Sequence, residues 1–207
     1  MAVEPFESKM RRGGSAAIEE ASRFFMRSDP VHLALRKVSK RLKDLGIPHA
    51  VAGGMALVAH GYDRTTVDVD VLVTAEGLKA VHENLSGLGY VPPFEGARQL
   101  RDAEHGVRIE FLVTGGFPGD GKPKPVAFPD PAASAVEIDG VSYVRLPTLV
   151  ELKLASGMTN PGRLKDLADV QEVIRCLGLK TDFAMQLHPY VRGKYQELLA
   201  AVDAERE

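Results

Sequence analysis

The sequence predicts a fold of the α/β class (α+β), with a small mixed β-sheet flanked by helices and further helices at the C-terminal end. Short apolar runs, several with a period of two, alternate with helical patterns as far as residue 145. Beyond that residue the patterns are all helical. At 207 residues the chain is long enough for one substantial core, and its 44% apolar and 26% charged residues are typical of a globular protein.

The composition excludes several classes of protein. No apolar run approaches the roughly 20 residues of a membrane span, and residues 1–17 contain no signal-peptide core, so we expect a cytoplasmic protein without a membrane partner. The formal net charge of −2 argues against a broad grip on double-stranded DNA, although it permits a local basic groove. The single cysteine, Cys176, cannot form an internal disulfide, and we predict that it packs in the core.

The chain is predicted to divide into three parts. These are a flexible tail at residues 1–14, a main domain at 15–180, and a C-terminal helix at 181–207 that packs on the core or on a partner. Helices are predicted over residues 15–26, 29–45, 55–60, 75–88, 146–156, 163–170 and 182–203. Strands are predicted over residues 48–52, 67–73, 90–91, 98–102, 107–113, 136–138 and 141–144.

Local signals set the ends of several of these elements. Ser28 or Asp29 can cap the helix that follows, in front of Pro30. Asp139-Gly140 is a strong two-residue hairpin signal, and Gly157 is expected to stop the helix before it. Residues 114–131 are rich in glycine and proline, and a loop of this length is usually functional or mobile.

Two aspartates lie on one face of the strand at residues 67–73. Its period-two pattern places Asp68 and Asp70 on the face opposite the valines, at a backbone spacing of roughly 6–7 Å. Burying two like charges side by side is costly, and a hard divalent cation such as Mg²⁺ or Mn²⁺ removes that cost. The pair therefore holds a cation or, alternatively, is a solvated pair on an open strand face.

A glycine pair precedes this strand. Gly53-Gly54 stands between an apolar strand and a short helix, where glycines let the backbone approach a ligand and the helix start offers unpaired amides to an anion. The alternative is a tight turn that binds nothing. A phosphate-binding turn shortly before a metal-binding carboxylate pair is the arrangement that phosphoryl or nucleotidyl transfer needs.

Together these residues resemble a known family. The pattern G-G-x-A-L-x-x-x-G-x-x-R-x-T-x-D-x-D, from Gly53 to Asp70, is similar to that of the minimal nucleotidyltransferases of the polymerase-beta-like superfamily, and most of all to the AbiEii-like toxin nucleotidyltransferases. The resemblance covers roughly residues 30–180. It implies a nucleotidyltransferase-like domain and a metal-dependent transfer of a nucleoside monophosphate from a nucleoside triphosphate to a hydroxyl group.

The resemblance implies a metal site of three carboxylates. Asp68 and Asp70 would hold Mg²⁺ or Mn²⁺, and Glu110 would be the third carboxylate, on the strand beside theirs, as a metal ligand or as the base. Family members commonly have aspartate in that place. The alternative for Glu110 is an ion pair with Arg108 or with a neighbouring strand.

The resemblance also implies nucleotide contacts. Lys153, in the segment LPTLVELKLASG, matches a lysine that reaches toward the nucleotide, although a surface lysine would show the same pattern. The segment from Arg163 to Val170 resembles the family's R-x-K-D-x-x-D, which positions the reactive site or braces Lys153; a salt-bridged helix is the alternative. The implied nucleotide-binding residues are Gly53, Gly54, Arg64, Lys153, Lys165 and Asp166, and Lys153 joins the three carboxylates as the catalytic residues.

Several functions remain open at the level of sequence. The acceptor is transfer RNA, a protein hydroxyl or a small molecule such as an aminoglycoside, and an antitoxin partner would favour a role as the toxin of a toxin–antitoxin pair. Met55 departs from the family, whose serine or threonine after the glycine pair helps to hold phosphate. The alternatives are a catalytically degenerate module that binds a nucleotide or a partner, and a structural partner protein whose acidic pair merely binds a cation.

Overall fold

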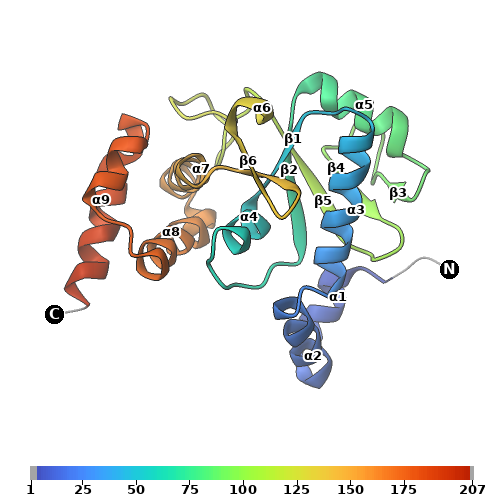
Figure 1. Cartoon of the computed structure of the whole chain (residues 1–207), viewed down its shortest axis with the longest axis horizontal. Helices are drawn as coiled ribbons and strands as arrows, with labels where there is room; N and C mark the ends of the chain where they lie inside the picture. Colours follow the sequence, from blue (N-terminus) through green and yellow to red (C-terminus); the bar gives the residue numbers. More distant parts are fainter. Residues whose placement is uncertain (1–3, 206–207) are drawn as a thin grey trace.

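The sheet of this protein has seven strands in the order β3-β4-β5-β2-β1-β7-β6, in a computed structural model that describes residues 4–205 (Figure 1). The strands are β1 (His49–Ala52), β2 (Asp68–Val73), β3 (Tyr90–Val91), β4 (Gln99–Asp102), β5 (Arg108–Val113), β6 (Ala135–Ile138) and β7 (Val141–Val144). β2 pairs with β5, and β1 with β7, in parallel, whereas the other four pairs are antiparallel. The predicted mixed sheet is confirmed.

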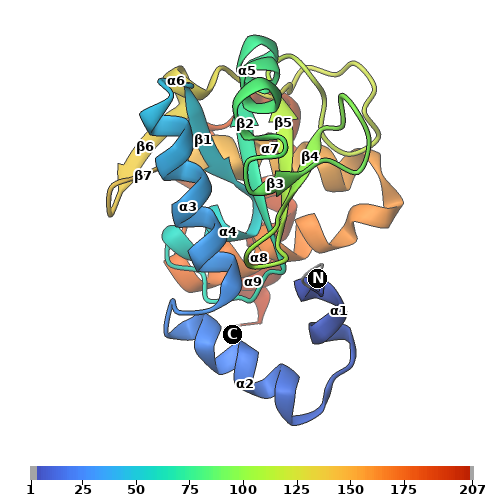
Figure 2. The same ribbon diagram turned by 90° about the vertical axis from the view of Figure 1, so that its right-hand side faces the viewer.

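Helices lie around this sheet and at one end of it. They are α1 (Phe6–Arg11), α2 (Gly14–Phe25), α3 (Pro30–Asp44), α4 (Gly53–Ala59), α5 (Ala75–Leu85), α6 (Pro131–Ser134), α7 (Leu146–Thr159), α8 (Leu164–Leu177) and α9 (Pro189–Ala204), with 3₁₀ turns η1 (Pro161–Arg163) and η2 (Thr181–Gln186). α3 packs on β1, β2 and β7, and α7, α8 and α9 pack on one another at the C-terminal end (Figures 1 and 2). In the described part of the chain, no helix is long and apolar enough to span a bilayer.

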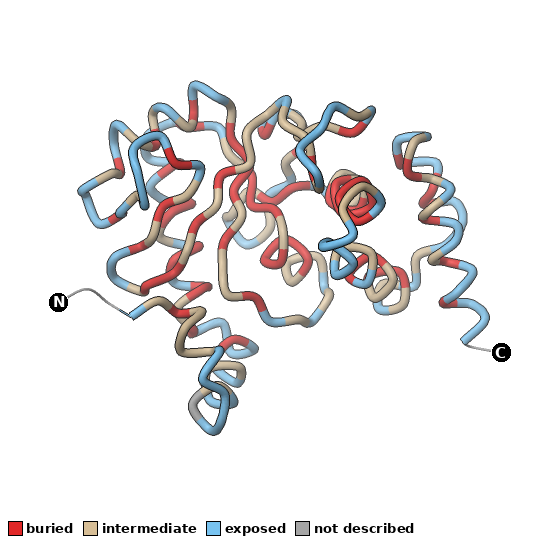
Figure 3. Tube along the Cα trace, turned by 180° about the vertical axis from the view of Figure 1, so that it is seen from behind, coloured by how far each residue is buried: buried red, intermediate tan, exposed pale blue. Residues whose placement is uncertain are grey.

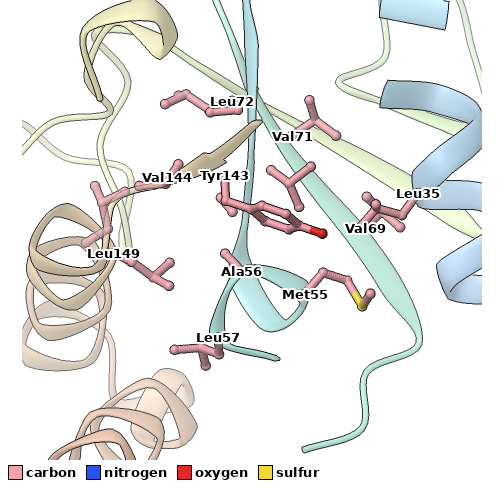
Figure 4. Packing of buried hydrophobic residues seen from close by; sticks show 14 of the residues in the cluster. Leu35, Met55, Ala56, Leu57, Val69, Val71, Leu72, Tyr143, Val144 and Leu149 are labelled. Carbon is pink, nitrogen blue, oxygen red and sulfur yellow. The ribbon is translucent and has the colours of Figure 1, made fainter. Parts of the chain in front are cut away.

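The core lies along the central strands and α7, where the buried positions concentrate (Figure 3). Helices cover the middle of the sheet, so β2 buries Leu72 as well as its three valines instead of alternating fully. Met55 points into this core, 2% exposed, beside Val69 and Tyr143 (Figure 4). The methionine that departs from the family pattern is therefore a packing residue here.

Local interactions explain where α3 begins and how β6 turns into β7. The carboxylate of Asp29 accepts hydrogen bonds from the amides of Val31 at 2.8 Å and His32 at 3.3 Å, and thereby caps α3 as predicted. Asp139 and Gly140 have φ values of +50° and +77°, which are typical of the turn that joins β6 and β7. The predicted hairpin is confirmed.

The structure corrects several predicted elements. The helix expected to stop at Gly157 continues to Thr159, because a glycine is required there for close packing against Leu167, not for a helix end. The last predicted helix begins only at Pro189, after the turn η2. The helix predicted to reach residue 88 ends at Leu85. Cys176 is exposed, so the prediction of a buried thiol is wrong.

The predicted N-terminal tail contains a short helix instead. Phe6 is buried, and its amide donates a hydrogen bond to the carbonyl of Gly106 at 3.2 Å. Glu7 pairs with Arg101 at 2.8 Å. Residues 1–3 of the predicted tail lie outside the described residues. The rest of it is attached to the β4–β5 hairpin.

Candidate active site

The three predicted metal-site carboxylates, Asp68, Asp70 and Glu110, line one cavity at the centre of the sheet. The parallel register of β2 and β5 places Asp70 opposite Glu110 and Asp68 opposite Arg108. Because side chains alternate along a strand, these four residues share one face of the sheet. The cavity beside them has a volume of about 400 Å³ and extends to α7 and α8, which contribute Lys153 and its neighbours.

The carboxyl group of Asp70 holds its proton more tightly than an ordinary aspartate does. Burial is the main cause that raises its pKa to about 7, and the charges of Asp68 and Glu110 add to it, while Lys153 and Arg108 offset only part of the rise. In the described part of the chain, neither Asp70 nor Glu110 has a hydrogen bond or an ion pair through its side chain. This face of the sheet therefore offers carboxylate oxygens that no protein cation neutralises.

Asp68 differs from the other two, because both its oxygens have partners. Its Oδ1 accepts a hydrogen bond from the Thr66 hydroxyl at 2.9 Å, and its Oδ2 pairs with Arg108 at 2.5 Å. The same hydrogen bond raises the pKa of the Arg108 guanidinium. Asp68, Asp70 and Glu110 do not lie as close together as the atoms of a preformed metal site. Among the described residues, only one group of three potential metal ligands has its atoms within 4.8 Å of one another, and that group lies outside this cavity.

The two glycines make room for the acidic strand. Gly53 has a φ of +58°, and a Cβ on it would lie 1.7 Å from Asp70 Oδ2. A Cβ on Gly54 would lie 2.8 Å from the Cβ of Thr66, the residue that holds Asp68. Both glycines line the cavity, and each is needed at its position because of the residue behind it.

Lys153 forms the opposite side of the cavity. It is 8% exposed, and its ammonium donates to Asp166 at 2.9 Å and to Asp169 at 2.7 Å. Burial alone would raise the pKa of Asp166, but Lys153 and the Ser156 hydroxyl, which donates to it at 2.7 Å, hold that pKa below its ordinary value. Lys165 is exposed at the rim of the same cavity.

Arg64 lines the cavity but is already paired. One guanidinium nitrogen donates to both oxygens of Asp169, at 2.8 and 2.6 Å, and its side chain is only 11% exposed. Arg64 therefore braces the carboxylate that holds Lys153. A direct contact between Arg64 and a nucleotide stays a prediction.

Comparison with solved structures identifies the fold. The crystal structure of ANT(2")-Ia in complex with adenylyl-2"-tobramycin matches with a TM-score of 0.51, over 84% of this chain and 98% of that chain, at 14% sequence identity. The chain shares the fold of ANT(2")-Ia. A suspected nucleotidyltransferase from H. pylori matches over 82% of this chain and 90% of its own, at 14% identity and a TM-score of 0.46. No protein-family model matches the chain, and no curated protein matches its sequence.

Three arginines line this cavity that were not among the predicted binding residues. Arg98, Arg108 and Arg163 all line it, and Arg98 has no ion-pair partner among the described residues. The period-two pattern of β5 already put Arg108 on the face of Glu110. The pattern could not show that the guanidinium turns to Asp68 on another strand.

Two further features lie outside this cavity. The clustered group is Asp102, Glu104 and His105, and Lys37 already pairs with both of its carboxylates, at 2.6 Å from Asp102 and 2.9 Å from Glu104. A larger hollow of about 690 Å³ lies between α5 and residues 92–96, away from the three carboxylates. The chemistry-bearing side chains therefore gather in the smaller cavity.

Proposed function

We propose that this protein is a metal-dependent nucleotidyltransferase, which moves a nucleoside monophosphate from a nucleoside triphosphate to a hydroxyl group of an acceptor. The observation that carries the proposal is the unpaired Asp70 carboxylate, whose pKa is raised by burial and by its acidic neighbours in a cavity that also holds basic side chains. A carboxylate in such surroundings favours a bound cation. The shared fold with ANT(2")-Ia agrees with this chemistry but does not by itself establish it.

The residues present fit a divalent metal ion. Carboxylate oxygens are the ligands that Mg²⁺ and Mn²⁺ prefer, and Asp68, Asp70 and Glu110 supply them from adjacent strands. The unpaired charge on Asp70 and Glu110 is what a cation would compensate. Bound there, Mg²⁺ or Mn²⁺ would neutralise charge on the triphosphate during the in-line displacement.

Residues of the chain would stabilise charge, accept a proton and contact the triphosphate. Lys153 would stabilise the negative charge that develops on the phosphates, and Asp166 and Asp169 keep its ammonium at the cavity wall. Glu110 would complete the metal site or accept the proton of the attacking hydroxyl. Gly53 and Gly54, without side chains, would let the triphosphate approach the backbone, and Lys165 would meet it at the rim.

The acceptor belongs to one of three classes. Transfer RNA, a protein hydroxyl and a small molecule such as an aminoglycoside are the candidates, and the structure of ANT(2")-Ia with adenylyl-2"-tobramycin makes tobramycin the first small molecule to test. We place the protein in the cytoplasm and in the AbiEii-like group. A role as the toxin of a toxin–antitoxin pair would require an antitoxin partner.

A catalytically degenerate module that binds a nucleotide or a partner is the second candidate function. Met55 no longer favours it, since this side chain lies in the core. The Arg108–Asp68 ion pair does favour it, because a permanent pair would remove one metal ligand. The nucleotidyltransferase would form a labelled product, whereas the degenerate module would bind its ligand without forming one.

Label transfer separates these functions. Each of the four α-³²P nucleoside triphosphates is offered with Mg²⁺ or Mn²⁺ to total RNA, to cell-lysate protein and to an aminoglycoside panel. We expect label on one acceptor class with the wild-type protein and none with Asp70→Asn, an uncharged variant of nearly the same shape. Nucleotide binding without any label would leave the degenerate module, and neither label nor nucleotide binding would mean that the acidic residues are structural.

A further inference from the structure

We propose that Arg108 is an internal counter-cation for Asp68. The metal ion must displace the Arg108 guanidinium from Asp68, and the displaced guanidinium then binds the triphosphate. This role rests on the proposed function and adds a coupling to it, since metal and nucleotide would each favour the binding of the other. Arg108 would be a positioning residue in the empty cavity and a nucleotide contact in the loaded one.

The asymmetry among the three carboxylates is the first observation. Both oxygens of Asp68 are occupied, Oδ1 by the Thr66 hydroxyl at 2.9 Å and Oδ2 by Arg108 at 2.5 Å. In the part of the chain that the structure describes, the side chains of Asp70 and Glu110 have neither a hydrogen bond nor an ion pair. A metal ion can therefore bind Asp70 and Glu110 directly, whereas at Asp68 it meets the positive charge of the Arg108 guanidinium, which already pairs with Oδ2 and repels a second cation.

Arg108 is the donor that can leave. Thr66 is 8% exposed, and its side chain packs against the backbone of Gly54, so it has little room to move. The side chain of Arg108 is 40% exposed and ends in the cavity, where it can turn about its long aliphatic stem. Release of Arg108 frees Oδ2 and leaves Oδ1 held by Thr66, which keeps the carboxylate in place.

A triphosphate gives the released guanidinium a new partner. Arginine presents five donors in a planar fork that suits phosphate oxygens, and Arg108 lines the cavity that holds the carboxylates. A metal ion that binds alone must break the Arg108–Asp68 pair and leaves Arg108 without an anionic partner. When nucleotide binds as well, Arg108 exchanges the Asp68 carboxylate for a phosphate group. Binding of the two ligands is therefore positively coupled, and the coupling is reciprocal.

Manganese binding tests this role without any turnover. Mn²⁺ affinity is measured by electron paramagnetic resonance for the wild type, Arg108→Gln, Arg98→Gln and Asp70→Asn, first without nucleotide. Arg98 is the matched control, because it contributes the same charge to the same cavity but has no carboxylate partner among the described residues. Circular dichroism melts verify folding, and Arg108→Met, which keeps the apolar stem, replaces Arg108→Gln if the latter does not fold.

We expect Arg108→Gln to bind Mn²⁺ alone roughly tenfold more tightly than the wild type, a size typical of coupling between sites. Arg98→Gln should stay close to the wild type, and Asp70→Asn should lose Mn²⁺ binding. In a second series, α,β-methylene analogues of ATP, GTP, CTP and UTP are added in turn. The analogue that binds should raise the Mn²⁺ affinity of the wild type more than that of Arg108→Gln.

Three results would contradict the proposal in different ways. If Arg108→Gln binds Mn²⁺ no more tightly than the wild type while Asp70→Asn loses binding, Arg108 is only a cross-strand partner of Asp68 and the metal site stands. If Arg98→Gln tightens binding as much as Arg108→Gln, the effect is one of overall charge and not of displacement. If neither the wild type nor Arg108→Gln binds Mn²⁺, even with each of the four nucleotide analogues present, the proposed function itself fails.

Discussion

A Cβ atom at Gly53 would lie 1.7 Å from Asp70 Oδ2, whereas a Cβ at Gly46 would meet no atom within 4 Å, although both glycines have a positive φ, of +58° and +66°. Alanine at Gly46 therefore suffers backbone strain alone, which costs roughly 1–2 kcal/mol in the left-handed region. Alanine at Gly53 adds a clash that must displace Asp70. We expect Gly53→Ala to lower the free energy of unfolding in urea by more than Gly46→Ala does, and to weaken Mn²⁺ binding. Equal losses for the two variants would contradict a steric role for Gly53.

The raised pKa of Asp70 has a consequence for stability. An aspartate in an unfolded chain titrates at about pH 4, and in the folded protein burial and then the charges of Asp68 and Glu110 raise this pKa to about 7. The folded-state pKa lies above the unfolded one, so the stability present below about pH 4 is lost progressively as the pH rises through about 7. We expect metal-free Asp70→Asn to be more stable than the wild type at pH 8 and about equal to it near pH 4.

Urea unfolding in the presence of EDTA at both pH values measures this difference, and EDTA keeps divalent metal from masking it. A variant that is less stable than the wild type at pH 8 would mean that the Asp70 carboxylate is stabilising. In that case the main support for a cation site at this position would be lost.

At the scale of elements, two helical glycines make opposite contributions. In α7, a Cβ at Gly157 would lie 2.5 Å from Leu167 Cγ of α8, whereas in α9 a Cβ at Gly193 would meet nothing within 4 Å. Alanine is favoured over glycine in a helix by about 1 kcal/mol, and overpacking costs about 1–3 kcal/mol. We expect Gly193→Ala to raise the melting temperature and Gly157→Ala to lower it. A rise in both would mean that α7 and α8 are packed more loosely than the structure shows.

The sequence predicted those elements whose signals are local. The alternating residues of β2 and β5, the Asp139-Gly140 turn and the Asp29 cap all lie within a few residues of the structure that they produce. Gly157 misled the prediction because its cause, Leu167, lies on the next helix. A glycine that ends a helix and a glycine that admits a neighbouring helix look the same in one sequence.

The candidate site shows the same limit. Its carboxylates were predicted from the spacing within β2 and from the family resemblance, and the structure brings Asp68, Asp70 and Glu110 to one cavity. The pairings of Arg64 with Asp169 and of Arg108 with Asp68 span 105 and 40 residues. No local pattern encodes an ion pair at such separations, because a long side chain takes its partner only after the elements have packed.

At the scale of the whole molecule, an ion-pair network ties α3 to β4, the strand next to the edge strand β3. Lys37 of α3 bonds to Asp102 of β4, which also holds His105. Burial alone would raise the pKa of Asp102, but the hydrogen bonds from Lys37 and His105 hold it below the ordinary 3.8. A lowered pKa means that the stability is fully present above about pH 4 and is lost as the pH falls through the folded-state value.

We therefore expect Asp102→Asn to lower the free energy of unfolding at pH 7, because the amide cannot neutralise Lys37. The difference from the wild type should shrink below about pH 4, where the aspartate itself becomes protonated. Urea unfolding at pH 7, 4 and 3 measures it. Asp44→Asn is a suitable control, since its partner Lys40 lies on the same helix and both side chains are largely exposed. A difference that stays constant across these pH values would exclude titration of Asp102 as its cause.

The parallel pairing of β2 with β5 also determines when the cavity can exist during synthesis. Asp68 leaves the ribosome 40 residues ahead of Arg108, and Lys153 follows later still. Parallel strands need such a crossover before they can pair, so a nascent chain that ends before β5 carries two aspartates with no cavity around them. Only after α7 and α8 have emerged can the carboxylates and Lys153 face one another. A prematurely terminated chain would thus lack the complete site.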